Sequence, residues 1–179
     1  MTSLTEFDET FLKSKPVLEM LTIANDFCLF IEKSEEYTRE QILVYLQRVM
    51  PVIYLKSSLL PDLAVEDEEA VEHYVTEEQW EDVFTTIRAK LGSDDLYYYI
   101  DLHEKTQQDA IRASIAENIA DIYQDLKDFI LLFQKPLQAF QENAVRECKT
   151  LFQNRYGYRI VHGHTAIHYL LQPDSSPWE

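Results

Sequence analysis

The sequence has few of the residues that make turns. It contains three glycines and six prolines among 179 residues, whereas a protein of many short strands needs turn residues at frequent intervals. A chain of this length can bury one core and is short for two, and 46% of its residues are hydrophobic. We therefore expect an all-α, single-domain bundle of five or six helices over residues 1–179, ending in a loose C-terminal tail at 173–179.

Basic side chains are also scarce. Sixteen lysines and arginines stand against 32 aspartates and glutamates, which gives a formal net charge of −16. Because this field repels phosphate backbones and anionic headgroups, neither nucleic acid nor a membrane is an expected partner. No stretch approaches the roughly 18 apolar residues of a bilayer span, and the start MTSLTEFDET does not read as an export signal. We expect a soluble, cytoplasmic protein.

The motifs of common reaction classes are missing. The sequence has no HExxH, P-loop, GxGxxG or GxSxG pattern, and no histidine follows a glutamate at the spacing of ferritin-like metal sites. The two cysteines, Cys28 and Cys148, form no CxxC pair, and each lies in an apolar helical pattern. We expect them to be buried free thiols.

Capping signals and apolar spacing predict the helices. Thr38 with Gln41 and Thr76 with Gln79 form two capping boxes, and Gly92 is a typical helix end. The expected helices cover about 3–15, 16–33, 39–60, 77–91, 108–134 (capped by Thr106 and Asp109) and a last region from Pro136 that Gly157 and Gly163 interrupt or bend. The stretch LYYYIDL, 96–102, could be extended, but no second candidate strand is evident, so we interpret it as an aromatic loop packed on the bundle.

One helix carries a polar line beside its apolar face. In the stretch 113–133, Ser114, Asn118, Asp121 and Asp125 step by four, three and four residues, and Glu117 lies further round. Carboxylates on that edge would lie at a contact between helices, where burial requires a partner for each of them. These partners could be neighbouring backbone groups or arginines such as Arg155 and Arg159, or the edge could line a functional pocket.

Three of the five histidines lie close together in VHGHTAIH, 161–168. On a helix His164 and His168 share one face, which allows two imidazoles to bind one metal, whereas His162 points away. Metal sites in helical bundles combine histidine and carboxylate ligands from facing helices. The candidate ligands for one divalent metal are Asn118, Asp121, Asp125, His164 and His168, with Ser114 and Glu117 along the same seam. Satisfied packing of the histidine pair is the alternative.

The phrase SIAENIADIYQDLKDF, 114–129, resembles a family known only as a domain of unknown function. Its members are small, acidic, all-helical bacterial proteins, and the resemblance includes YLKSSLLP at 54–61 and the later histidines. Ser114, Asp121, Tyr123 and Asp125 match the family pattern, Glu117 and Asn118 stand where it has two aspartates, and His162 or His164, with His168, takes the histidine places. The resemblance spans about 130 residues up to 171 and implies no activity.

Two functional hypotheses follow. The first is an acidic, non-enzymatic module that binds a protein partner, because ten carboxylates and no lysine or arginine occur between Asp62 and Asp82. Its interaction surface would comprise Glu68, Glu69, Glu72, Tyr97, Tyr98 and Tyr99. The second is a metal-binding or metal-dependent hydrolytic bundle, in which the metal would lower the pKa of a bound water and a carboxylate would act as the base.

Overall fold

The structure, a computed structural model, describes residues 11–102 and 109–172. The expected first helix and the C-terminal tail lie largely or wholly outside the described residues. The described elements, in chain order, are α2 (Lys15–Glu32), α3 (Arg39–Ser58), α4 (Glu77–Leu91), β1 (Leu96–Tyr99), β2 (Ile111–Ser114), α5 (Ile115–Phe133), α6 (Gln138–Leu151) and α7 (Gly157–Leu171). The predicted all-α bundle is therefore confirmed, with one small two-stranded sheet added to it.

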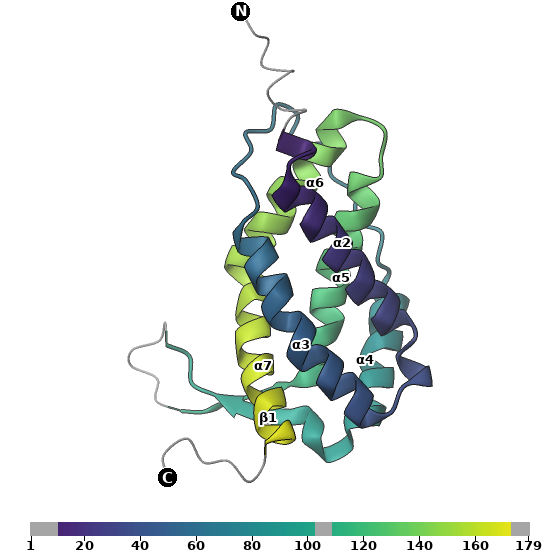
Figure 1. Cartoon of the computed structure of the whole chain (residues 1–179), viewed down its shortest axis with the longest axis vertical. Helices are drawn as coiled ribbons and strands as arrows, with labels where there is room; N and C mark the ends of the chain where they lie inside the picture. Colours follow the sequence, from purple (N-terminus) through teal and green to yellow (C-terminus); the bar gives the residue numbers. More distant parts are fainter. Residues whose placement is uncertain (1–10, 103–108, 173–179) are drawn as a thin grey trace, which may run out of the picture.

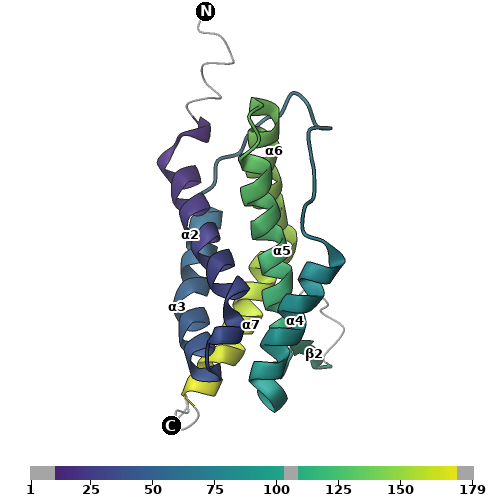
Figure 2. The ribbon, with the colours of Figure 1, turned by 90° about the vertical axis from the view of Figure 1, so that its right-hand side faces the viewer.

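Helix α5 is the centre of the bundle. It contacts α2, α4, α6 and α7, while α3 packs against α2 and α7 on the other side (Figures 1 and 2). Its apolar residues Ile115, Ile119, Ile122 and Leu126 are fully buried, as the helical spacing predicts. Among the described residues, none of the helices is both long and apolar enough to cross a bilayer.

The predicted helix starts that depend on local signals are confirmed. The backbone N–H of Gln41 donates to the side chain of Thr38, and the N–H of Gln79 donates to that of Thr76, each within a complete capping box. Helix α4 ends at Gly92, whose φ of 59° is a conformation that disfavours any side chain. Cys28 and Cys148 are buried free thiols, as expected.

Two predictions about the middle of the chain are wrong. The stretch 96–102 is extended in its first four residues, as its composition allows, but it is not an unpaired loop: Leu96–Tyr99 forms β1, which pairs antiparallel with β2 so that Tyr99 lies opposite Ile111. The long helix begins at Ile115 instead of about 108, because residues 111–114 belong to β2. The cap of α5 is accordingly Ser114, which accepts the N–H of Glu117 at 3.0 Å.

The last helical region is interrupted immediately before Gly157, where a Cβ atom would collide with the backbone oxygen of Phe152, and it continues without a break through Gly163. A single π-helical turn, Phe152–Tyr156, joins α6 to α7, which begins at Gly157. Gly163 lies inside α7 where that helix passes close to α5, and a Cβ atom there would lie 3.2 Å from Nδ2 of Asn118. A π-helical turn shifts the side chains that follow it, and such turns occur frequently at functional sites.

Candidate functional site

The polar edge of α5 lies against the π-helical turn and the first turns of α7. At its middle, Arg159 donates from Nη1 to the side-chain oxygen of Asn118 at 3.1 Å and lies 2.5 Å from Asp121 through Nη2. The indole N–H of Trp80 donates to the other oxygen of Asp121 at 2.7 Å. The guanidinium of Arg159 is therefore held in one orientation by two side chains of α5.

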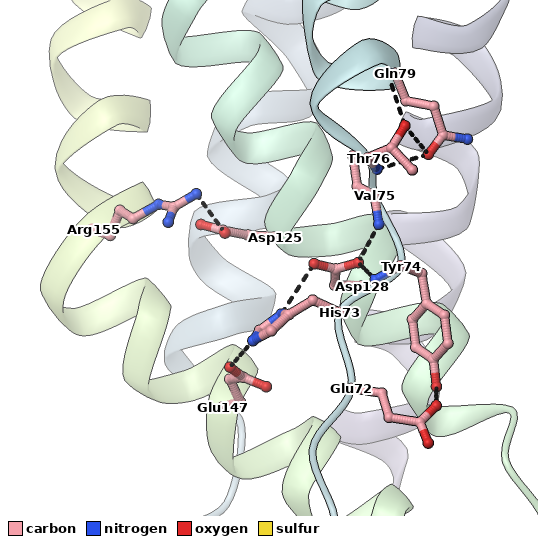
Figure 3. Close-up of polar contacts among 10 residues, drawn as sticks. All are labelled: Glu72, His73, Tyr74, Val75, Thr76, Gln79, Asp125, Asp128, Glu147 and Arg155. Atoms are coloured by element: carbon pink, nitrogen blue, oxygen red, sulfur yellow. Dashed lines mark hydrogen bonds and ion pairs between the residues drawn. The ribbon is translucent and has the colours of Figure 1, made fainter.

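Asp125 lies deeper on the same edge and pairs with an arginine of the π-helical turn. Its Oδ1 lies 2.9 Å from Nη2 of Arg155, and its side chain is only 4% exposed. Oδ2 of Asp125 and Nε of Arg155 are buried, and neither has a hydrogen-bond partner. Burial raises the pKa of Asp125 to about 7, against the opposing effect of Arg155. Figure 3 shows the two side chains pointing toward one another.

The histidines of VHGHTAIH face other partners. Nε2 of His164 lies 3.0 Å from the backbone oxygen of Gln47, and Nδ1 of His168 lies 3.5 Å from the side-chain nitrogen of Gln47, both on α3. The structure thus directs this pair toward α3, and it does not bring the pair together with Asp121 and Asp125, which face arginines. Within residues 11–102 and 109–172, no three His, Cys, Asp or Glu side chains are arranged to hold a metal ion.

A polar cavity is lined by the antiparallel pair of β1 and β2 (the hairpin), the start of α5, the π-helical turn and the start of α7. Its volume is about 590 Å³. We call it the arginine pocket, because three arginines from different elements line it: Arg112 from β2, Arg155 from the π-helical turn and Arg159 from α7. Asp101 and Glu117 also line it, as do Tyr97, Tyr99, Asn118, Asn154, Tyr158 and His162.

Arg112 differs from the other two pocket arginines. Arg155 and Arg159 are paired with Asp125 and Asp121, whereas Arg112 is exposed and has no ion pair within the part of the chain that the structure describes. A charge without a fixed partner is available to a ligand. The hydroxyl of Tyr97 accepts a hydrogen bond from Nδ2 of Asn118 at 2.5 Å, which joins the hairpin wall of the pocket to α5.

A smaller cavity of about 220 Å³ lies on the other side of Arg155. His73, Asp125, Asp128, Glu147 and Cys148 are among the residues that line it. Nδ1 of His73 lies 3.2 Å from Asp128 and Nε2 lies 3.6 Å from Glu147 (Figure 3). Burial raises the pKa of Glu147. We call this space the inner cavity; Arg155 lines both it and the arginine pocket.

Asp128 fastens the loop between α3 and α4 to the inner cavity. Its Oδ1 accepts the backbone N–H groups of Tyr74 and Val75 at 2.7 and 2.9 Å. The loop runs down the outer side of α5 and α6 before it enters α4 (Figure 2). Asp128 belongs to the stretch 114–129, but nothing in the sequence indicates that its partners would be backbone groups more than fifty residues away.

The predicted interaction surface divides into two parts. In the acidic loop, Glu68 lies 3.0 Å from Arg146 and Glu72 lies 3.1 Å from Lys135, while Glu69 is exposed. The tyrosines lie at the opposite end of the bundle on β1: Tyr97 and Tyr99 line the arginine pocket, and Tyr98 is 66% exposed. The ring of His162, which helical geometry predicts to point away, stacks on Tyr99 at 4.0 Å.

Several pocket residues carry no signal in the sequence. Arg112 and Tyr158 belong to no motif, and they line the pocket because β2 and the start of α7 both border it. Asp95 is also missed: it is 1% exposed, and it accepts the hydroxyl of Ser114 at 2.8 Å and the N–H of Ala116 at 2.7 Å. It thereby fixes the start of α5 beside the pocket.

Comparisons with known proteins agree with the fold. A family model described as "Domain of unknown function (DUF5063)" matches residues 12–172, which confirms the resemblance inferred from the long helix. A crystal structure of protein BF1032 from Bacteroides fragilis, a Northeast Structural Genomics Consortium target, has a TM-score of 0.80 and 32% sequence identity, and the match covers 93% of this chain and 97% of that chain. No curated protein matches the chain. Neither match describes an activity.

Proposed function

The chain belongs to the DUF5063 family, which assigns no activity, and we propose from the geometry of the arginine pocket that it is a binding module for a small anionic ligand. The observation that carries this proposal is the meeting of Arg112, Arg155 and Arg159 in one cavity. The chain has 16 basic side chains against 32 acidic ones, and three of the sixteen share this pocket.

The side chains suit a carboxylate or a phosphate group. Guanidinium groups are planar donors that bind such groups through paired hydrogen bonds. Asn118 and Asp121 hold Arg159 from one side, and Trp80 in turn donates to Asp121, so the orientation of Arg159 is fixed before a ligand arrives. Arg112 brings a charge that forms no ion pair with a carboxylate of the described residues.

The other lining residues limit the charge of the ligand. Asp101 and Glu117 face the same cavity, and a ligand with several negative charges would be repelled by them. One carboxylate or phosphate group is therefore the best match. A volume of about 590 Å³ lies within the range of small-molecule sites, and the tyrosines and Asn154 can donate hydrogen bonds to the ligand.

The sequence suggests that the tyrosine stretch 97–99 belongs to a protein-binding surface. We propose that Tyr97 and Tyr99 line a small-molecule site instead. Tyr97 and Tyr99 contribute to a concave pocket, and two predicted acidic contact residues, Glu68 and Glu72, already have basic partners on α6 and the preceding turn. A binding role is retained. The partner that we propose is a small anion instead of a protein.

The test measures anion binding and its dependence on the pocket. Isothermal titration of the full chain with inorganic phosphate and with acetate should show saturable binding of at least one anion, weakened by raised chloride. Arg112→Gln should weaken it about tenfold or more, because it removes a charged hydrogen-bonding partner. The matched control is Arg146→Gln, whose partner Glu68 lies on the acidic loop and whose loss should leave binding unchanged.

Two results would refute the proposal. One is the absence of binding by every simple carboxylate and phosphate at millimolar concentration. The other is equal binding by the wild type and the Arg112→Gln variant, which would place the anion elsewhere on the surface.

A further inference from the structure

A second, more apolar cavity shares a wall with the arginine pocket. Its volume is about 410 Å³, and it lies between β1 and the C-terminal half of α7. We call it the aromatic cleft. Leu96, Tyr98, Ala166, Tyr169 and Leu170 line it, together with Tyr97, Tyr99 and His162, which also line the arginine pocket.

We propose that the ligand of the arginine pocket is an amphipathic organic anion, whose carboxylate or phosphate binds the arginines while an apolar body of about one ring lies in the aromatic cleft. This inference rests on the proposed function of the arginine pocket. It adds the chemical class of the ligand.

The shared wall is the first support. The rings of Tyr99 and His162 stack with their centroids 4.0 Å apart and their planes 27° from parallel, and both rings border both cavities. A ligand that passes along this stack would contact arginines at one end and apolar side chains at the other. Partial burial lowers the pKa of His162, with Asp101 acting in the opposite direction. A neutral imidazole is suited to such a ring stack.

The exposure of apolar side chains is the second support. Leu96, Tyr98 and Tyr169 are 40%, 66% and 54% exposed, although they stand next to one another around a cleft. Exposed apolar groups that cluster around a concave surface are typical of binding sites. Aromatic rings favour a flat apolar partner, because stacked and edge-to-face arrangements stabilise such pairs beyond simple burial.

The charge of one cavity and the apolar lining of the adjoining one decide which class of ligand fits both. A ligand confined to the aromatic cleft would leave Arg112 in the adjoining arginine pocket without a counterion, and a simple inorganic anion would leave the aromatic cleft empty of apolar contacts. Only a ligand that has both parts satisfies both cavities. The sizes of the two spaces, about 590 and 410 Å³, fall in the range of small-molecule sites.

The experiment compares matched anions with and without a ring. Titrations of the full chain with inorganic phosphate and phenyl phosphate, and with acetate and phenylacetate, give the contribution of the ring for each head group. We expect the ring to tighten binding about tenfold or more in at least one pair, from burial of its apolar surface. N-acetylphenylalaninate extends the carboxylate series: tighter binding than phenylacetate would identify a peptide C-terminus as the source of the anion, and weaker binding would identify a free small molecule.

Variants separate this inference from the proposed function. Tyr169→Ala removes a ring of the aromatic cleft, and Ala166→Trp fills the cleft; each should bring phenyl phosphate close to the affinity of inorganic phosphate and leave inorganic phosphate unchanged. Arg112→Gln should weaken both ligands. Leu55→Ala, at an exposed apolar position of α3, is the control and should change neither.

The outcomes are distinguishable. If inorganic phosphate or acetate binds and the ring adds nothing, the amphipathic class is refuted while the anion-binding function stands. If the ring adds affinity but neither cleft variant reduces it, the apolar body lies elsewhere and the inference is likewise refuted. If none of the anions binds, the proposed function itself fails, and the inference fails with it.

Discussion

The guanidinium of Arg155 lies 2.9 Å from the carboxylate of Asp125. This ion pair ties the π-helical turn to the central helix and sets the position of one of the three pocket arginines. It is incomplete on both sides, since Oδ2 of Asp125 and Nε of Arg155 are buried without hydrogen-bond partners. Burying an ionised carboxylate in that position costs free energy, and burying a protonated carboxyl group costs less.

The first prediction concerns the pH dependence of stability at Asp125. Burial raises the pKa of Asp125 in the folded state from its ordinary value of 3.8 to about 7. The folded state therefore holds this proton more tightly than the unfolded state, so its contribution to the free energy of unfolding is full below about pH 4 and is lost as the pH rises to about 7. Between pH 5.5 and 8 the wild type should lose on the order of 2 kcal/mol that Asp125→Asn does not lose.

Urea unfolding at the two pH values measures this difference. The charged groups that face Asp125 include Asp121, Asp128, Arg155 and Arg159, and all four are present in both proteins. Asp82→Asn, at an exposed carboxylate of α4, should retain the wild-type pH dependence. Parallel stability curves for the wild type and Asp125→Asn would show that Asp125 does not titrate in this range.

The second prediction concerns the loop that Asp128 holds. Asp128→Ala removes the acceptor of two backbone N–H groups, those of Tyr74 and Val75, and the partner of His73. Each bond to a charged group contributes roughly 1.5 to 3 kcal/mol. The freed N–H groups of a half-buried loop can bond to water instead, which reduces the sum, so the free energy of unfolding should fall by about 2 to 4 kcal/mol. Asp128→Asn keeps one carbonyl oxygen and should cost about half as much.

Limited proteolysis provides an independent measurement of the same contact. Cleavage within 61–76 should be faster in Asp128→Ala than in Asp128→Asn and the wild type. If the two variants unfold at the same urea concentration and are cleaved at the same rate, the backbone contacts of Asp128 do not hold the loop.

The helices that sequence predicts correctly are those whose signals are local. Thr38 and Gln41, and likewise Thr76 and Gln79, lie three residues apart, and both members of each capping box are visible in the sequence. The start of α5 is predicted too early because the signal that sets it is not local. Ile111 fits the apolar spacing of the helix, but its backbone pairs with Tyr99, twelve residues earlier. A strand pairing across a connection of that length has no local signature.

Only part of the candidate site can be predicted from the sequence. Helical spacing identifies Asn118, Asp121 and Asp125 as one polar edge that needs partners, and the arginine alternative, Arg155 and Arg159, is the arrangement that the structure has. Spacing also places His164 and His168 on one face. It cannot decide which neighbour that face meets, because α7 contacts both α3 and α5. That choice depends on how the helices pack in three dimensions.

The third prediction concerns the cysteines. Burial raises the pKa of the Cys148 thiol to about 12, and burial raises that of Cys28 as well. Since the thiolate is the reactive form, neither should react with a thiol-specific reagent at pH 8 in the native protein, and both should react in denaturant. The native reaction should be at least about a hundredfold slower than that of a free thiol. Rapid modification of one cysteine under native conditions would contradict its burial.

The last prediction concerns the binding of a divalent metal. The hypothesis of a histidine and carboxylate site, which the sequence suggests, requires such a metal. Asp121 and Asp125 each pair with an arginine, and His164 and His168 face Gln47. A cation would have to displace both arginines and bring together side chains that face different helices. We therefore expect that a chelator leaves the unfolding temperature unchanged to within about 1 °C, since a metal that binds the folded state would stabilise it.

Elemental analysis of protein purified without chelator tests the same point. Close to one equivalent of zinc, manganese or iron that is lost in both Asp121→Ala and His168→Ala would restore the metal hypothesis, and it would mean that the ion pairs of the arginine pocket rearrange when metal binds.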